Sequence, residues 1–167
     1  LYPGGKYENG MAAQGKILLA CCGNTQVNGR YGNSIFLSKD SGQNWNEIDS
    51  QTLNLEFRSK ALAVRGDNLY VGGFGEVMVS NDVGRNWQAV SAGIPNNRDV
   101  TNLAVDGDRI YAVTYGAGTN SLISGVYLLT NQGKSWAEVG PKNGIEVNEF
   151  TAFTASGASL FVGTSEG

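Results

Sequence analysis

A short motif occurs three times along the 167-residue chain and constrains the fold more than any other feature. The copies read SKDSGQNW, SNDVGRNW and LTNQGKSW, and they end at Trp45, Trp87 and Trp136. These are all the tryptophans of the chain, and each holds the same place in the motif. Their interval is roughly 40–50 residues, the length of a repeat built from four short strands. The chain is therefore expected to repeat one β unit.

A second pattern precedes each copy of the motif. Residues Leu62–Val71 match Leu103–Ala112, and looser copies occupy Met11–Leu19 and Phe153–Val162. Each copy is a pair of short apolar runs about a glycine-containing turn, the pattern of a β-hairpin. The repeat unit is thus a hairpin of strands A and B, a variable loop, strand C, a turn bearing Asp or Asn, and strand D from the tryptophan onward.

The residue types of the C–D turn each have a physical role. The carboxylates of Asp40 and Asp82 can accept hydrogen bonds from turn amides, and the hydroxyls of Ser38 and Ser80 can hold further backbone groups. The glycine two residues after each Asp can adopt a positive φ, and the tryptophan ring can bury its area against the adjacent sheet. The third copy has Asn in place of Asp and lacks the Ser, so we expect it to be held most weakly. The full set of turn positions is Ser38, Asp40, Gly42, Trp45, Ser80, Asp82, Gly84, Trp87, Asn131, Gly133 and Trp136.

The pattern S-x-D-x-G-x-x-W resembles the Asp-box, or BNR repeat, of sialidase-like β-propellers. The resemblance implies an all-β fold of four-stranded antiparallel blades, of which about three and a half are present. The expected blades cover residues 5–50, 51–91 and 92–140, with a half blade at 141–167. Because a propeller closes with roughly four to eight blades, we expect the remaining blades to come from the same chain or from a second copy. The resemblance also implies that the Asp-box is structural and lies far from any active site.

Composition excludes several classes of function. The chain has no histidine, so the Ser-His-Asp and Cys-His nucleophile systems and zinc sites built on imidazole are excluded. The two cysteines, Cys21 and Cys22, are neighbours on an expected strand and point to opposite faces, which favours buried thiols. A net charge of −3 disfavours nucleic acid, and the longest apolar run is too short for a membrane helix. We expect no cofactor, no metal, no nucleic acid and no membrane insertion.

The resemblance places ligands at the face where the B–C and D–A loops open. Residues 23–34 and 115–125 read as long, variable B–C loops, since they are rich in Gly and Asn. The candidate ligand-binding residues on this face are Arg30, Tyr31, Arg98 and Tyr115. The alternative, that these loops are ordinary solvated surface, stays open.

Catalysis would need further groups at the mouth of the channel. Alignment of the A strands puts Arg58, Asp99 and Glu149 at equivalent positions there. A sialidase-like enzyme would need three arginines around a carboxylate, for which Arg30, Arg58 and Arg98 are the candidates, but the Arg-Ile-Pro motif of that family is absent. A xyloglucanase-like enzyme would need two carboxylates across a cleft, for which Asp99 and Glu149 are the candidates.

From these observations we expect a non-catalytic binding or scaffold module of a secreted or cell-envelope protein. Its expected partner is a protein or a glycan that meets the loop face. The alternative is a segment of a glycoside hydrolase, sialidase-like or xyloglucanase-like, whose remaining catalytic residues lie outside this chain. Fold alone does not decide between them.

Overall fold

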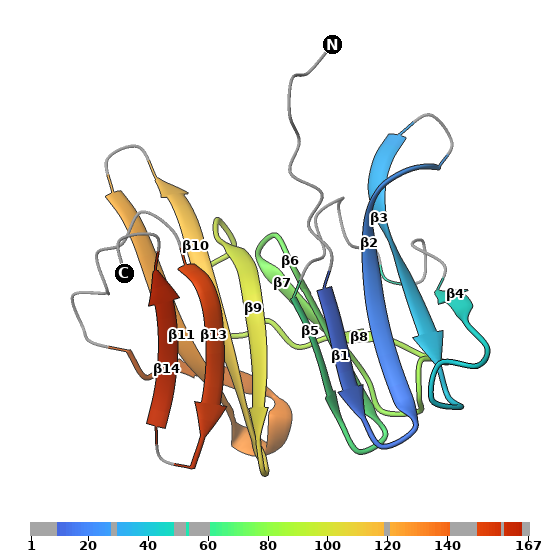
Figure 1. The fold of residues 1–167 in the computed structure, drawn as a ribbon. Helices are drawn as coiled ribbons and strands as arrows, with labels where there is room; N and C mark the ends of the chain where they lie inside the picture. Colours follow the sequence, from blue (N-terminus) through green and yellow to red (C-terminus); the bar gives the residue numbers. More distant parts are fainter. Residues whose placement is uncertain are drawn as a thin grey trace.

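The computed structural model of the chain describes residues 10–27, 30–48, 53, 61–118, 121–140, 150–157 and 159–164. They form four antiparallel sheets, each drawn from one continuous stretch of sequence and standing beside the next (Figure 1). This confirms the predicted all-β architecture. Within the described residues, no helix is long and apolar enough to cross a membrane.

Three of the sheets have four strands that pair in chain order, as expected for blades. Blade 1 contains β1 (Gly10–Gln14), β2 (Ile17–Val27), β3 (Arg30–Ser38) and β4 (Asn46–Ile48). Blade 2 contains β5 (Ala61–Arg65), β6 (Asn68–Gly73), β7 (Glu76–Ser80) and β8 (Gln88–Ala89). Blade 3 contains β9 (Asp99–Asp106), β10 (Arg109–Gly118), β11 (Ser121–Thr130) and β12 (Ser135–Glu138), with the 3-10 turn η1 (Asn131–Gly133) before β12. The fourth sheet pairs β13 (Phe150–Ser156) with β14 (Ser159–Thr164).

The two segments predicted as long loops are mostly strand, which corrects that expectation. Strands β2 and β3 stay paired as far as Val27 and Arg30, and β10 and β11 as far as Gly118 and Ser121. Glycine and asparagine suggested loops, but β-branched and aromatic residues interleave with them and favour extended pairing. The Asn28-Gly29 dipeptide is a hairpin signal that could have revealed the first of these ladders.

Consecutive blades pack through apolar side chains that alternate along each strand. In β6, Leu69 and Val71 are buried with residues of blade 1, whereas Tyr70 is buried with residues of blade 3. The two faces of blade 2 therefore take part in two separate cores. This is the pattern expected for a strand buried on both faces.

The three tryptophans have different surroundings, although their positions in the repeat are equivalent. Trp136 is only 4% exposed, and its indole N–H donates to the carbonyl of Val90 in blade 2 at 2.6 Å. Trp45 is 40% exposed, and its N–H donates to the carbonyl of Gly42 in its own turn at 3.0 Å. The expectation that every ring is buried against an adjacent sheet is therefore wrong for Trp45, because no described sheet packs on that face of blade 1.

The outermost sheets also expose residues whose repeat equivalents are buried. Met11 is 69% exposed, but its equivalent Leu62 is only 8% exposed, at the contact of blade 2 with blade 1. On the last sheet, Phe161 is 56% exposed, but the equivalent Tyr70 is buried between blades 2 and 3. Each outer face thus has the apolar pattern of a blade interface.

Candidate functional site

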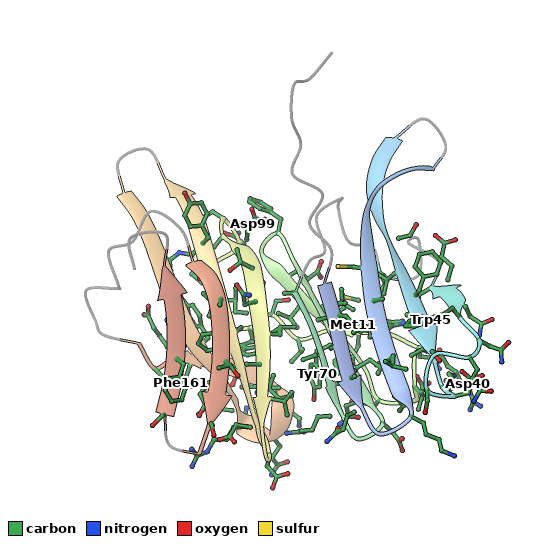
Figure 2. All side chains as sticks on the ribbon, viewed as in Figure 1. Met11, Asp40, Trp45, Tyr70, Asp99 and Phe161 are labelled. Atoms are coloured by element: carbon green, nitrogen blue, oxygen red, sulfur yellow. The ribbon has the colours of Figure 1, made fainter. Side chains whose placement is uncertain are left out.

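The sheets have two distinct ends. The turn end carries the A–B turns at Gly15, Gly66 and Gly107 and the C–D turns that contain Asp40 and Asp82, which we call the Asp turns. The loop end carries the β6–β7 connection and the start of β9. Figure 2 places Asp40 at the lower end of the sheets and Asp99 at the opposite, upper end.

At the turn end, Asp40 organises its whole turn. Its Oδ1 accepts hydrogen bonds from the Ser38 hydroxyl at 2.8 Å and from the Asn44 amide at 2.9 Å. Its Oδ2 accepts from the side-chain amide of Asn44 at 2.6 Å, while the Ser38 hydroxyl accepts from the Gly42 amide at 2.8 Å. These hydrogen bonds are of the kind expected for Ser38 and Asp40, but sequence reasoning missed Asn44, whose signal was its recurrence in the second copy.

The second Asp turn repeats this arrangement. Asp82 accepts from Ser80 at 2.9 Å and from the backbone and side-chain amides of Asn86 at 2.9 and 2.6 Å. The hydrogen bonds from the asparagine amides are the main cause that lowers the pKa of Asp40, and likewise of Asp82, from 3.8 to about 2. Both carboxylates are therefore fully ionised structural groups and not acids suited to proton transfer near neutral pH.

Glycines take a positive φ in both turns, as predicted, with values of 88° at Gly42 and 81° at Gly84. The preceding residues also have a positive φ, 61° at Ser41 and 56° at Val83. The positive φ of Val83 was not expected, because a β-branched residue resists this conformation. The dense hydrogen bonding of the turn holds it there.

The third turn is built differently. Asn131 and Gln132 both have a positive φ in η1, and the side chain of Asn131 makes no hydrogen bond to any described residue. Instead, the Thr130 hydroxyl donates to the carbonyl of Ser135 at 3.1 Å. The third turn thus has fewer side-chain hydrogen bonds than the Asp turns, in line with the expectation of a weakly held third copy.

Neighbouring A–B turns are linked by side chains that reach the next blade. Gln14 accepts from the Gly66 amide, and Arg65 donates to the carbonyl of Asp108 at 2.5 Å. Arg109 continues the series to the carbonyl of Gly157 at 3.5 Å. The side chain of Arg65 is therefore used within the structure, to link two turns.

At the loop end, Arg98 lies between blades 2 and 3, and its side chain packs against two glycines. A Cβ on Gly116 would come within 3.1 Å of the Arg98 side chain, and one on Gly125 would come within 3.0 Å of its Nη1. The guanidinium donates to the Tyr127 hydroxyl at 3.2 Å. Gly116, Gly125 and Tyr127 were not predicted as site residues, and their only signal is the pairing of small and aromatic residues on the two strands.

The side chain of Tyr127 is buried away from solvent at this contact. Burial raises the pKa of its hydroxyl above 10.0, although the Arg98 charge and the Thr114 hydroxyl both act to lower it. The neutral phenol is thus favoured. It accepts a hydrogen bond from Arg98 and holds that cation against β11.

Asp99 lies at the centre of a row that crosses three strands. It forms an antiparallel bridge with Phe74, just beyond β6, and it is opposite Tyr115 in the β9–β10 ladder. Phe74 is 57% exposed, whereas Asp99 and Tyr115 are half-buried. Oδ1 of Asp99 is buried, and no described residue donates a hydrogen bond to it. We call Phe74, Asp99 and Tyr115 the aromatic–acid row.

The structure thus brings together Arg98, Asp99 and Tyr115 of the predicted site residues. Arg58 and Glu149 lie outside the described residues, and so do the side chains of Arg30 and Tyr31, whose backbone belongs to β3. Within the described part of the chain, no group of three His, Cys, Asp or Glu residues could hold a metal ion. The chemistry available at the described loop end is an aromatic surface beside a carboxylate.

Comparison with known proteins adds to this geometry. No known protein family and no curated protein sequence matches the chain. Among solved structures, it is similar to a GH74 xyloglucanase from Xanthomonas campestris, with 18% identity, a TM-score of 0.59 and coverage of 84% of this chain and 24% of that one.

Two other solved structures are similar. YCF48 bound to a D1 peptide has 16% identity and a TM-score of 0.52, with coverage of 87% of this chain and 42% of that one. A Hadza microbial sialidase has 14% identity and a TM-score of 0.51, with coverage of 84% and 34%. The chain thus spans less than half the length of each of these proteins. In fold, the described sheets are similar to consecutive blades of these β-propellers.

Proposed function

We propose that the chain is a non-catalytic binding or scaffold module of an Asp-box β-propeller that engages a protein or a glycan through its loop end. The observation that carries the proposal is the aromatic–acid row, where an aromatic side chain that is 57% exposed borders a carboxylate without a hydrogen-bond partner. Exposed aromatic residues on a rigid frame are typical of binding surfaces. The module belongs to a secreted or cell-envelope protein, and further blades complete it.

The carboxylates at the two ends differ in their hydrogen bonding, and this difference supports a binding role at the loop end. At the turn end, Asp40 and Asp82 have their carboxylates occupied by hydrogen bonds from their own turns. At the loop end, Oδ1 of Asp99 is buried and accepts no hydrogen bond from the described residues, so the charge of this carboxylate is not used to hold a turn. One of the similar propellers, YCF48, is bound to a peptide, which favours a protein ligand over a glycan.

A glycoside hydrolase segment is the second candidate, favoured by the similarity to a xyloglucanase and a sialidase. In this alternative, Asp99 would be one of two carboxylates that flank a glycosidic bond, and Glu149 the other. Single substitutions Asp99→Asn and Glu149→Gln in the whole protein would then abolish release of sugars from xyloglucan or a sialoside. Under the binding proposal, the unmodified protein releases none.

The binding proposal is tested by probing the chain on an array of peptides and an array of glycans, with two variants alongside. Phe74→Ser changes the exposed aromatic residue of the loop end. Phe161→Ser is its matched control, because Phe161 is 56% exposed but lies on the outer face of β14. We expect Phe74→Ser to lose the bound ligands and Phe161→Ser to keep them.

Two results would contradict the proposal. The first is an absence of any ligand on either array. The second is equal loss of binding in both variants, which would mean that the loop end is not the site.

A further inference from the structure

The aromatic–acid row has a geometry that selects the chemistry of its ligand. Residues opposite one another in antiparallel pairs project their side chains to the same side of a sheet. The bridge of Phe74 with Asp99 and the pairing of Asp99 with Tyr115 therefore set one carboxylate between two aromatic rings. Figure 2 shows Asp99 at the upper end of β9, away from the Asp turns.

The negative charge of Asp99 has no counter-charge in the described structure. Its sequence neighbour Arg98 is turned toward Gly116 and Gly125 and donates to Tyr127. Oδ1 of Asp99 is buried without a partner, although a buried carboxylate oxygen is costly to leave unpaired. Glu76, at the start of β7 and two residues after Phe74, adds a second carboxylate to this end of blade 2.

Three ligand chemistries can be compared against this row. An anion is repelled by Asp99. A sugar could stack on Phe74 and donate a hydroxyl, but it would leave the charge uncompensated. A cation with N–H donors neutralises the charge of the carboxylate and is attracted by the faces of both rings.

The geometry points to a binding site for the basic side chain, lysine or arginine, of a protein partner, held between Phe74 and Tyr115 with its N–H groups on Asp99. This inference rests on the proposed binding function and names the chemistry of its ligand. The ring of Phe74 supplies a π-face, and the carboxylate of Asp99 supplies the acceptor.

The test is a titration of the isotope-labelled chain followed by nuclear magnetic resonance. The probes are acetyl-Gly-Lys-Gly-amide, acetyl-Gly-Arg-Gly-amide, acetyl-Gly-Glu-Gly-amide and cellotetraose. We expect the two basic peptides to shift the amide signals of residues 74, 99 and 115, and the acidic peptide and the sugar to leave them unchanged.

Variants then assign the interaction to the row. Asp99→Asn keeps the size of the side chain but removes its charge and should weaken binding about tenfold. Asp67→Asn is the matched control, because it removes the same charge from an exposed turn at the other end and should not change the affinity. Phe74→Leu keeps an apolar side chain without a π-face and should also weaken binding, so it gives the same answer if Asp99→Asn fails to fold.

The inference is overturned if the basic peptides cause no shifts, if they bind Asp99→Asn and Phe74→Leu as tightly as the unmodified chain, or if cellotetraose binds at the row instead. If one of these results is obtained but the arrays still show ligands whose binding depends on Phe74, the proposed binding function is retained. Only the inference that its ligand is a basic side chain is then wrong. If the chain binds no ligand on either array, both the proposed binding function and the inference of a basic ligand are contradicted.

Discussion

The two ends of the same sheets differ in how completely their polar groups are paired. At the turn end, the carboxylate of Asp82 accepts four hydrogen bonds from Ser80, Arg85 and Asn86. At the loop end, the carboxylate of Asp99 has a buried oxygen with no partner, beside an exposed phenylalanine. Acidic residues of one repeat fold can therefore differ in role: Asp82 fixes the backbone of its turn, whereas we propose that Asp99 binds a ligand.

The largest effect should come from the tryptophan that joins the blades. Trp136→Ala is expected to lower the free energy of unfolding by about 3–5 kcal/mol, because it removes a buried ring and its hydrogen bond to Val90. Trp45→Ala removes an equivalent ring that is 40% exposed and should cost less than about 1 kcal/mol. Urea denaturation measures both values. Equal losses would show that the position in the repeat, and not contact with a preceding blade, sets the contribution of the ring.

The next effect concerns the serine of an Asp turn. Ser80→Ala should lower the free energy of unfolding by about 1–3 kcal/mol, because it leaves the Gly84 amide without its acceptor and takes one donor from Asp82. Thr130→Ala in the third turn removes hydrogen bonds to Ser135 alone and should cost about 1 kcal/mol. A larger loss for Thr130→Ala would contradict the ranking of the three turns.

A pH dependence should follow from the two carboxylates. The folded-state pKa of both Asp40 and Asp82 is lowered from 3.8 to about 2, so their contribution to stability is present above pH 3.8 and is lost as the pH falls through about 2. Thermal unfolding recorded from pH 5 to pH 2 should show the midpoint fall across this window. The fall should be smaller in the double variant Asp40→Asn, Asp82→Asn, and an unchanged fall would assign it to other groups.

The repeat explains why so much of the fold could be predicted. The spacing of the three tryptophans indicated the length of the repeat, and the glycine turns indicated the hairpins, because a positive φ is a local requirement that glycine meets in any context. Gly42 and Gly84 have the predicted backbone conformation for this reason. The mixed Gly- and Asn-rich segments were misread, since their strands depend on pairing with a partner strand and not on local propensity.

The site was harder to predict because its residues meet only through tertiary structure. Arg98, Asp99 and Tyr115 were candidates from their place in the repeat, but the bridge of Asp99 with Phe74 joins two different blades. The glycines that make room for Arg98 also lie on separate strands. The exposure of Trp45 depends on which sheets pack beside blade 1, and the residues of the motif do not determine this.

The most direct test of the separation between the two ends is a paired measurement of stability and ligand binding for Phe74→Ser and Ser80→Ala. We expect Phe74→Ser to change the free energy of unfolding by less than about 0.5 kcal/mol, because the ring of Phe74 is 57% exposed. We expect the same variant to lose ligand binding, because Phe74 belongs to the aromatic–acid row. Ser80→Ala should be destabilised and, while folded, should bind as the unmodified chain does. If Phe74→Ser lost as much stability as Ser80→Ala, or if folded Ser80→Ala lost its ligand, the separation of a structural turn end from a binding loop end would be contradicted.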